Sequence, residues 1–389
     1  GHGRIQSSDS MVNRVSCRNE LKFFVQKISR AHFYGMEEDE DMWKKIILSL
    51  LIIISGVAGF FVAKAQVTFN NTLNHVNRDY DTALKNVDLS GIKVNSDDDI
   101  VNILVVGNDY RKEKGYDASG LTDTMIIATM DMKHGMLKLT TLMRDMVVDI
   151  PGHDPNKLNS PNSFGGIELL YKTIAQNFNI ELDGYVEVGF EAFEKIVNSV
   201  GGVEVELTES EANYLNTTNY ISKKKYRHVK VGKQILNGNQ ALGYCRIRKG
   251  GTFTVTGLTD DYGRTWRQRA VITAVFDKVK ALPATKWLEI ANNVLDGYVT
   301  TDLSNDKILE YITDVVKMGT TKVYQLQIPV NGYYRASASG EYSCGSSIVM
   351  TDGVNSTRDS SANAEALNKF IFDYNGKKAF KYGTFTAEQ

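Results

Sequence analysis

The sequence predicts an α/β protein, in which a mixed central sheet is flanked by helices on both faces and is preceded by a single N-terminal transmembrane helix. From Ile100 onwards, short β-rich runs alternate with longer runs of helical periodicity. The chain has 389 residues, of which 42% are hydrophobic, so it can bury a large core. One long, uncharged apolar run stands near the N-terminus.

Residues 46–63, "IILSLLIIISGVAGFFVA", are long enough to cross a bilayer as one helix. Lys and Arg residues are denser before this run than after it: Lys27, Arg30, Lys44 and Lys45 against Lys64 and Arg78. This bias predicts a single-pass cell-membrane protein with its N-terminus inside and its larger part outside. A cleaved signal peptide is the alternative because Ala63-Lys64-Ala65 resembles a cleavage site, although the apolar run is longer than usual.

The transmembrane run divides the chain into segments. We expect a tag-like remnant at 1–10, a cytoplasmic segment at 11–45, the transmembrane helix at 46–63, a polar juxtamembrane stalk at 64–99 and an extracytoplasmic domain at 100–389. The last segment is predicted to be one domain, because the whole chain has only five prolines and no internal repeat.

The first half of this domain contains three predicted strands and a helix. The apolar run at 100–107 is typical of a buried strand, and two β-rich runs at 124–131 and 136–142 are predicted to form a hairpin around Lys133 to Gly135. Apolar residues at 165–178 recur with helical spacing, which predicts a helix there.

The second half continues the alternation. A strand at 184–190 leads into a helix at 190–200, which Gly201-Gly202 ends, and the alternating "VEVEL" at 203–207 is the next strand. Later elements follow the same patterns: a strand at 241–248, a helix at 263–282, helical segments around 285–297 and 304–318, and a strand at 322–330. The Ser-, Asn- and Gly-rich stretch at 337–363 is predicted to be a surface excursion before the last helix.

Cysteine usage excludes a disulfide-rich fold. Cys17, Cys245 and Cys344 are too few for a disulfide framework and lack metal-ligand spacing. On the predicted strand, Cys245 alternates with arginines and should point into the core. We therefore expect a buried, inert thiol, with a bridge between Cys245 and Cys344 as the alternative.

A cluster of cations surrounds a Gly/Thr-rich loop between Tyr244 and Arg269. Its members are Arg246, Arg248, Lys249, Arg264, Arg267 and Arg269. The whole chain is nearly neutral, with 45 Lys and Arg against 46 Asp and Glu, so the cluster is local.

The spacing within the cluster favours an anion site. On the predicted strand, Arg246 and Arg248 face the same side about 7 Å apart, while Arg264, Arg267 and Gln268 share a side of the following helix. Arginine guanidinium groups that can donate paired hydrogen bonds, a Gly-rich loop and a helix N-terminus are together typical of a phosphate-binding site. The alternative is a solvated cationic face that is partly neutralised by Asp260 and Asp261.

Carboxylates follow the first strands of the domain. Asp109 comes after the strand at 100–107 and Asp123 comes just before the next one, where α/β sheets place ligands. The two could share a Mg²⁺, or each could cap a local turn or pair with Arg111. Arg144 with Asp145, and Lys157 with Asn159, are further candidates, although an isolated Arg-Asp pair is more often structural.

The order of these motifs resembles the extracytoplasmic domain of the LytR-CpsA-Psr family of cell-wall phosphotransferases. Over residues 100 to 282 the matching motifs are GNDYR, LTDT, MRD, NKLN with FGG, VGFEAFEKIVNSVGGVEVEL, GKQILNGNQALGYCRIRK and DDYGRTWRQ. The resemblance implies transfer of a glycosyl-phosphate polymer, such as wall teichoic acid or capsular polysaccharide, from a polyprenyl-pyrophosphate carrier to a peptidoglycan sugar hydroxyl. The cofactor it implies is Mg²⁺, with Mn²⁺ as a substitute.

The resemblance also assigns roles to residues. Catalytic positions are Arg144, Asp145, Arg246, Arg248 and Arg264. Further contacts to the pyrophosphate come from Arg111, Lys157, Asn159, Arg267 and Gln268. Metal ligands are Asp109 and Asp123. The proton of the sugar hydroxyl could pass to Asp145 or to Asp123, and the sequence does not decide between them.

Two other functional classes remain open. A hydrolase of the same lipid pyrophosphate would need the same cations and metal, with water in place of the sugar. A noncatalytic wall-binding or regulatory protein is the second alternative. Nucleic-acid binding is not expected, because the charge is balanced and no helix-turn-helix is evident. The predicted partners are the lipid-linked glycan, peptidoglycan and, through one helix, the membrane.

Overall fold

The computed structural model describes residues 77–79, 83–108, 122–282, 286, 299–320, 322–377, 379–381 and 385–386. The predicted transmembrane helix at 46–63, the segments at 1–10 and 11–45, and all but Lys286 of the helix predicted at 285–297 lie outside these residues. Within the described ranges, no helix has both the length and the apolar character needed to span a membrane.

A mixed sheet forms the centre of the domain. Among the described residues it has eight strands, in the order β1-β10-β7-β2-β3-β4-β11-β14. Their bounds are β1 Asn77–Arg78, β2 Ile100–Asn108, β3 Thr122–Asp131, β4 Met136–Leu142, β7 Gly184–Gly189, β10 Val299–Thr301, β11 Val323–Ile328 and β14 Phe385–Thr386. The sheet is mixed: β2 pairs with β7 and β4 with β11 in parallel, whereas β3 is antiparallel to both of its neighbours, β2 and β4.

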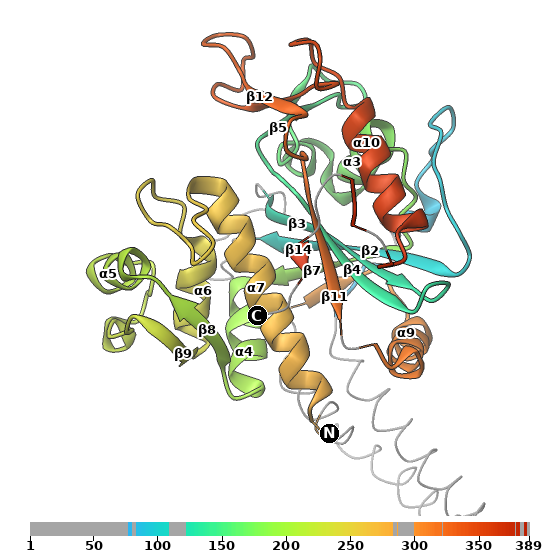
Figure 1. Ribbon diagram of the computed structural model, residues 1–389. Helices are drawn as coiled ribbons and strands as arrows, with labels where there is room; N and C mark the ends of the chain where they lie inside the picture. The colour runs from blue at the N-terminus through green and yellow to red at the C-terminus, as the bar shows by residue number, and fades with distance from the viewer. Residues whose placement is uncertain are drawn as a thin grey trace, which may run out of the picture. The chain divides into compact units, whose positions relative to one another are not determined.

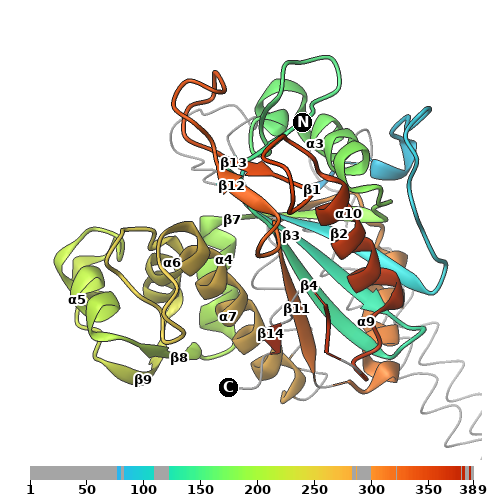
Figure 2. The same ribbon diagram turned by 45° about the horizontal axis from the view of Figure 1, so that its top comes forward.

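Helices cover both faces of this sheet (Figures 1 and 2). Leu104 of β2 packs in a core with Leu170 of α3 (Pro161–Phe178) and Leu367 of α10 (Ser361–Asn368). Side chains one position away point to the opposite face, where Ile103 packs against Ile308 of α9 (Asn305–Met318). Helix α7 (Asp260–Lys280) lies on this second face. The predicted mixed sheet with helices on both faces is therefore confirmed for the described domain.

A second, smaller core lies beside the sheet. Its elements are α4 (Phe190–Ser199), β8 (Val203–Leu207), α5 (Glu209–Thr217), β9 (Gly232–Leu236), α6 (Gly238–Arg246) and one side of α7. Val197, Leu215 and Tyr244 are fully buried within it. Because α7 contributes to this core and also packs on the sheet, its N-terminus is held from two sides (Figure 1).

Most predicted elements are confirmed within a few residues, and two predictions are wrong. The described part of the predicted stalk at 64–99 belongs to the domain, because β1 pairs with β10 and Leu84 and Val87 are buried in the main core. The segment predicted as a strand at 241–248 is mainly helical, because α6 runs to Arg246. A capping box starts this helix: the Asn237 side chain accepts from Gln240 N at 3.0 Å, and Gln240 Oε1 accepts from Asn237 N at 3.1 Å. These two bonds satisfy the helix N-terminus and outweigh the alternation that indicated a strand.

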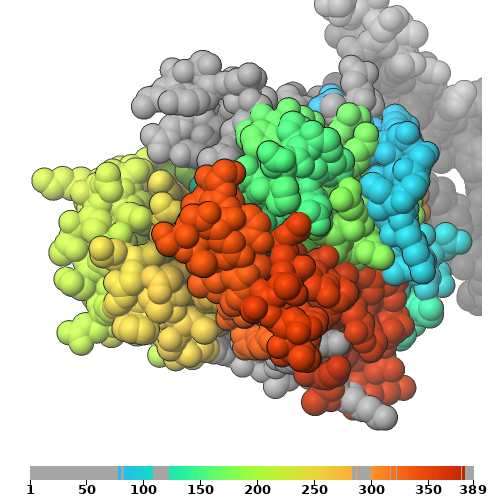
Figure 3. Space-filling view, turned by 90° about the horizontal axis from the view of Figure 1, so that it is seen from above, coloured from blue at the N-terminus to red at the C-terminus, as the bar shows by residue number. Residues whose placement is uncertain are grey.

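The stretch at 337–363 is only partly a surface excursion. It contains β13 (Ile348–Met350), which pairs with β12 (Tyr334–Ala336) and, in parallel, with β5 (Met146–Val148); β5 also pairs with β6 (Asn156–Lys157). Ile348 N donates to Asp145 O at 2.9 Å. In Figure 3 this orange-to-red segment lies at the surface between α3, in green, and the yellow loop before α7. The C-terminal part of the chain thus borders the loop that carries Arg144 and Asp145.

Candidate active site

Arg144 is the centre of a cluster of carboxylates. It lies between β4 and β5, and the antiparallel pairing of β3 with β4 brings the start of β3 next to it. Its Nη1 donates to Asp123 Oδ1, and its Nε lies 3.4 Å from Asp145 Oδ1 and 4.0 Å from Asp261 Oδ2. The Arg144 side chain is 14% exposed, so three acids converge on one largely desolvated cation.

The first turn of α7 supplies the second cation. Arg264 Nη2 lies 3.3 Å from Asp261 Oδ1, and its side chain is 6% exposed. Burial lowers the pKa of Arg264, although the charges of Asp261, Asp123 and Asp145 act in the opposite direction. Asp261 sits in the first helical turn, where the helix dipole favours negative charge. Asp123, Arg144, Asp145 and Arg264 were predicted as site residues, and the structure brings all four together.

The two acids Asp145 and Asp261 interact directly. Burial, a side-chain hydrogen bond to Asp261 and the charge of Asp261 raise the pKa of Asp145 to about 6. Burial alone would raise the pKa of Asp261. The hydrogen bond from Asp145 and the charges of Arg264, Arg144 and Arg248 outweigh burial, so the pKa of Asp261 is lowered. The pair therefore holds one proton at mildly acidic pH, and Asp145 carries it.

Sequence reasoning treated Asp261 only as a possible neutraliser of a cationic face and did not assign it to the site. A signal for it was present, because an acid in the first turn of a helix, three residues before an arginine, can pair with that arginine. Its partner Asp145 comes from a distant loop, and no sequence pattern relates the positions of the two.

Both cations of the cluster have unused hydrogen-bonding capacity. The buried Nε of Arg144 and the buried Nε of Arg264 each lack a hydrogen-bond partner among the residues that the structure describes. Burying a guanidinium donor without an acceptor is unfavourable, and an arginine fork matches the oxygens of carboxylates and phosphates. These two Nε–H groups are therefore suited to an anionic ligand.

Arg246 and Arg248 do not share the face of a strand as predicted. Arg246 ends α6, where its guanidinium carbon lies 5.0 Å from the ring centre of Phe190 and 5.7 Å from that of Tyr220. Arg248 is exposed in the following loop, and its charge contributes to the lowered pKa of Asp261. Arg248 is thus electrostatically linked to the cluster, whereas Arg246 is fixed over two aromatic rings.

Arg267 is wrongly predicted as a pyrophosphate contact. It is fully buried, and its Nε donates to Glu211 Oε1 at 2.7 Å. Its other donors bind the carbonyl oxygens of Ile247, at 3.0 Å, and Thr252, at 3.2 Å. Arg267 therefore holds the loop that follows α6. Gln268, one residue later, is 9% exposed, and its amide has no hydrogen-bond partner among the described residues.

Lys157 and Asn159 lie next to the cluster. The charge of Lys157, on β6, lowers the pKa of Asp145 and so opposes the effect of burial. Asn159 is buried, and its backbone N donates to Arg144 O at 3.2 Å. Asp109 and Arg111, the remaining predicted site residues, lie outside the described residues.

A metal site can be judged only from Asp123. Its side chain is 42% exposed, so it can offer an oxygen to a cation, and Mg²⁺ usually takes one or two carboxylates with water and phosphate as the other ligands. Within the described ranges, no three His, Cys, Asp or Glu residues form a metal-binding group. Asp123 is therefore the one predicted metal ligand within the described residues, and its exposed carboxylate could contribute one oxygen to Mg²⁺.

Both cysteines in the described part of the domain are free thiols. Cys245 is buried, and burial raises its pKa to about 12, while Cys344 is partly exposed. The predicted buried, inert thiol at Cys245 is confirmed, and the alternative bridge to Cys344 is not formed.

A mixed sheet that places two buried arginines among acids at the ends of its strands defines a candidate site for a phosphate-bearing substrate. The LytR_cpsA_psr family model matches residues 60–355, and the chain belongs to this family. The predicted family is thereby confirmed.

Among the relatives is the polyisoprenyl-teichoic acid–peptidoglycan teichoic acid transferase TagU of Enterococcus faecalis, which is 34% identical over 237 residues, or 60% of this chain and 70% of the relative. TagU of Bacillus anthracis is 28% identical over 304 residues, which is 77% of this chain and 90% of the relative. The regulatory protein MsrR of Staphylococcus aureus is 29% identical over 234 residues, which is 60% of this chain and 66% of that protein.

The fold is shared with solved structures. A structure of TagT bound to LI-WTA superposes with a TM-score of 0.54 at 23% identity, covering 71% of this chain and 93% of that one. YwtF (TagT) with bound octaprenyl pyrophosphate lipid superposes with a TM-score of 0.50 at 22% identity, covering 71% and 93%.

Proposed function

We propose that this chain is a phosphotransferase that moves a glycosyl-phosphate polymer from a polyprenyl-pyrophosphate carrier to a sugar hydroxyl of peptidoglycan, assisted by Mg²⁺. The polymer would be wall teichoic acid, capsular polysaccharide or a related glycan. The domain would act outside the cell, held at the membrane by the helix predicted at 46–63. Membership of a family with relatives named as teichoic acid transferases supports the polymer class.

One observation carries the proposal: two buried arginines, Arg144 and Arg264, lie at one site, and the Nε–H of each makes no hydrogen bond to the described residues, although Arg144 Nε forms an ion pair with Asp145. A pyrophosphate diester offers several non-bridging oxygens close together, which would satisfy both donors. Arginines held in place by Asp123 and Asp261 need not reorganise during the reaction, and such preorganised charge is the main source of catalysis in phosphoryl transfer.

The reaction is a substitution at the phosphorus that carries the polymer. The acceptor hydroxyl oxygen forms a bond to this phosphorus, the bond from phosphorus to the bridging oxygen breaks, and polyprenyl phosphate leaves. Negative charge grows on the leaving oxygen, where Arg144 and Arg264 would stabilise it. No external ATP is required, because the pyrophosphate bond is already energy-rich.

The proton of the acceptor hydroxyl would pass to Asp145. Asp123 is the weaker candidate, because its Oδ1 accepts from Arg144 Nη1 and its side chain is more exposed than that of Asp145. With a pKa raised to about 6, Asp145 is ionised at neutral pH and still basic enough to accept a proton. Arg144, whose Nε lies 3.4 Å from Asp145 Oδ1, would hold this carboxylate in position.

Mg²⁺ bound through Asp123 and Asp109 would neutralise phosphate oxygens and polarise the phosphorus. One carboxylate oxygen of Asp123 would bind Arg144 while the other binds the ion. Its exposure makes this possible without unpairing the arginine.

The test uses the full chain in detergent, with a short-chain polyprenyl-pyrophosphate saccharide, a peptidoglycan oligosaccharide and Mg²⁺, followed by mass spectrometry. We expect a phosphodiester-joined glycan that disappears with EDTA and in Arg264→Ala. Glu204→Gln, on the exposed side of β8, is the matched control and should keep the activity. Free saccharide phosphate without joined product would indicate the hydrolase alternative, and intact lipid would indicate a binding or regulatory protein.

A further inference from the structure

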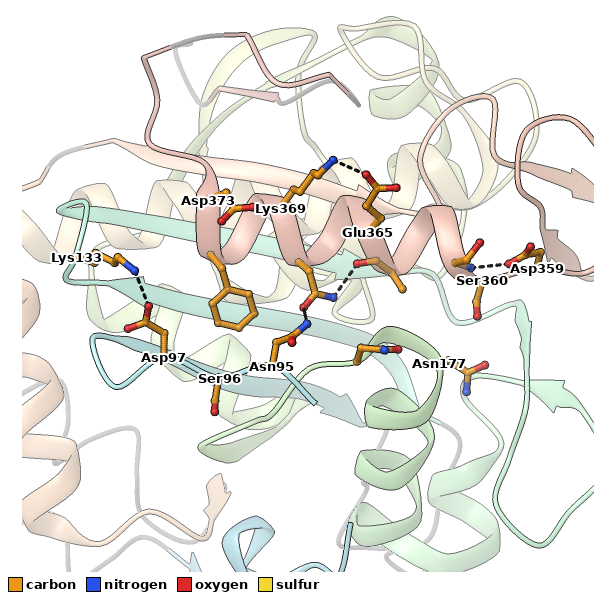
Figure 4. A pocket seen from close by; sticks show the side chains of 15 residues that line it. Asn95, Ser96, Asp97, Lys133, Asn177, Asp359, Ser360, Glu365, Lys369 and Asp373 are labelled. Carbon is orange, nitrogen blue, oxygen red and sulfur yellow. Dashed lines mark hydrogen bonds and ion pairs between the residues drawn. The ribbon is translucent and has the colours of Figure 1, made fainter. Parts of the chain in front are cut away.

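An open groove of about 740 Å³ runs along α10, on the face of the sheet opposite α7. Its walls come from the segment before β2, the β3–β4 turn, the end of α3, α10 and the π-helical turn η4 (Lys369–Asp373). Asparagine amides, serine hydroxyls and charged groups line almost all of it, and the ring of Phe372 is its one aromatic contribution among the described residues. Figure 4 shows these side chains along the helix, with Glu365 and Lys369 on one side of it and Asn95, Ser96 and Asp97 on the other.

The amides of the groove are fixed in place. Asn95 N donates to Asn179 O at 3.0 Å, and the Asn95 carbonyl accepts from Glu181 N at 3.1 Å, so the backbone is held on both sides. Asn95 Nδ2 donates to Asn368 Oδ1 at 2.8 Å, and Asn368 Nδ2 in turn donates to backbone carbonyls of α3 and α10. Among the described residues, Asn95 Oδ1 accepts no hydrogen bond, and its side chain is exposed. A preoriented acceptor thus faces the solvent in the groove.

The groove carries an excess of negative charge. Four carboxylates line it against two lysines, and each lysine is already paired: Lys133 with Asp97 at 2.7 Å, and Lys369 with Glu365. This leaves Asp359 and Asp373 as excess negative charge. Such a surface repels phosphate-rich chains and favours ligands that carry amide, hydroxyl and ammonium donors.

One end of the groove is joined to the loop of Asp145 through the strand β13. Asp359 N donates to Met350 O at 2.9 Å, and Met350 belongs to β13. The first residue of this strand donates to Asp145 O. From Asp359 the groove follows α10 and η4 towards Lys133, over thirteen residues or about 20 Å of helix. An extended ligand that reaches Asp145 and fills the groove would have to pass over β13.

From this arrangement we infer that the groove binds the acceptor: an uncharged, amide-rich glycan segment with an amine-bearing peptide, as peptidoglycan provides. The inference rests on the proposed function, because it names the binding site of the acceptor in that reaction. The donor polymer, which is rich in phosphate, is assigned to the side of Arg144 and Arg264.

The test compares Asn95→Ala and Asp373→Asn with Glu204→Gln, which removes an equivalent exposed charge from β8. Calorimetry measures binding of a soluble peptidoglycan fragment, made of N-acetylated disaccharides with amine-bearing peptides, to the full chain in detergent. Each groove variant should bind the fragment about tenfold more weakly, since each loses one hydrogen bond or charge contact. In transfer assays the KM for the acceptor should rise about tenfold, with kcat and the KM for the lipid unchanged. Thermal unfolding checks that each variant is folded.

Unchanged fragment binding in both folded variants would overturn the inference. So would displacement of the fragment from the wild-type protein by poly(glycerol phosphate), because this would assign the groove to the donor polymer. Fragment binding that depends on Asn95 and Asp373 supports the groove assignment even if no transfer product forms, and in that case the proposed function alone fails.

Discussion

Replacing Asp145 with asparagine should abolish transfer and yet stabilise the folded protein at neutral pH. The pKa of Asp145 is raised to about 6 from the ordinary 3.8, by burial and by Asp261. In the unfolded chain the carboxyl recovers its ordinary pKa, so the folded state holds the proton more tightly. The stability that this group contributes is complete below about pH 4, declines as the pH rises and is lost above about pH 6.

The magnitude follows from the shift. Two pKa units correspond to about 3 kcal/mol. The Asp145 side chain is 22% exposed, so solvent screens the effect only in part, but the lowered pKa of Asp261 returns some of this free energy. The asparagine side chain would keep the shape and a hydrogen-bond donor towards Asp261 without the second charge. We expect Asp145→Asn to raise the free energy of unfolding by about 1–3 kcal/mol at pH 7.5, or several degrees in Tm.

Thermal unfolding of the full chain at pH 7.5 and at pH 4 measures this effect. The stability gain of Asp145→Asn should be present at pH 7.5 and nearly absent at pH 4. The control Asp260→Asn, at an exposed neighbouring position, should change the stability at neither pH. Transfer by the wild type should rise about tenfold per pH unit below pH 6 and level off above it, whereas Asp145→Asn should lose at least about a hundredfold. A variant that is less stable than the wild type at pH 7.5, or equally shifted at both pH values, would refute the shared-proton pair.

Three further outcomes are expected. Arg264→Lys should lower the transfer rate by about a hundredfold, because an ammonium cannot reproduce the guanidinium fork, and wild-type turnover in this variant would exclude Arg264 from the site. Arg267→Met should cost about 3–5 kcal/mol of stability in urea unfolding by leaving Glu211 buried and unpaired; adding Glu211→Gln should recover part of the loss, and failure to do so would argue against the ion pair. Cys245 should react with iodoacetamide only as fast as the protein unfolds, whereas labelling of Cys245 in the native state at pH 8 would contradict its burial.

The strands were predictable because each is an apolar or alternating run with one dominant period. Helix α6 was not, because its nine residues are almost all buried, so burial imposes no helical periodicity, and the Asn237–Gln240 capping box was the decisive signal. The presence of a cation cluster was predictable from the sequence, but which of its arginines face the candidate site was not. Helical spacing puts Arg264 and Arg267 on neighbouring sides of α7, and only the position of Glu211 decides that Arg267 turns away from the site.

The contacts of these arginines explain why a nearly neutral chain concentrates cations in one segment. Arg267 and Arg269 are fully buried and hold α7 to its surroundings: Arg267 binds Glu211 and two loop carbonyls, and Arg269 donates to Gln325 and Thr141. Arg267 binds towards the smaller core and Arg269 binds towards the sheet, so α7 is fixed from two sides. Structural arginines in the middle of α7 therefore hold in place the helix that presents Arg264 to the candidate site.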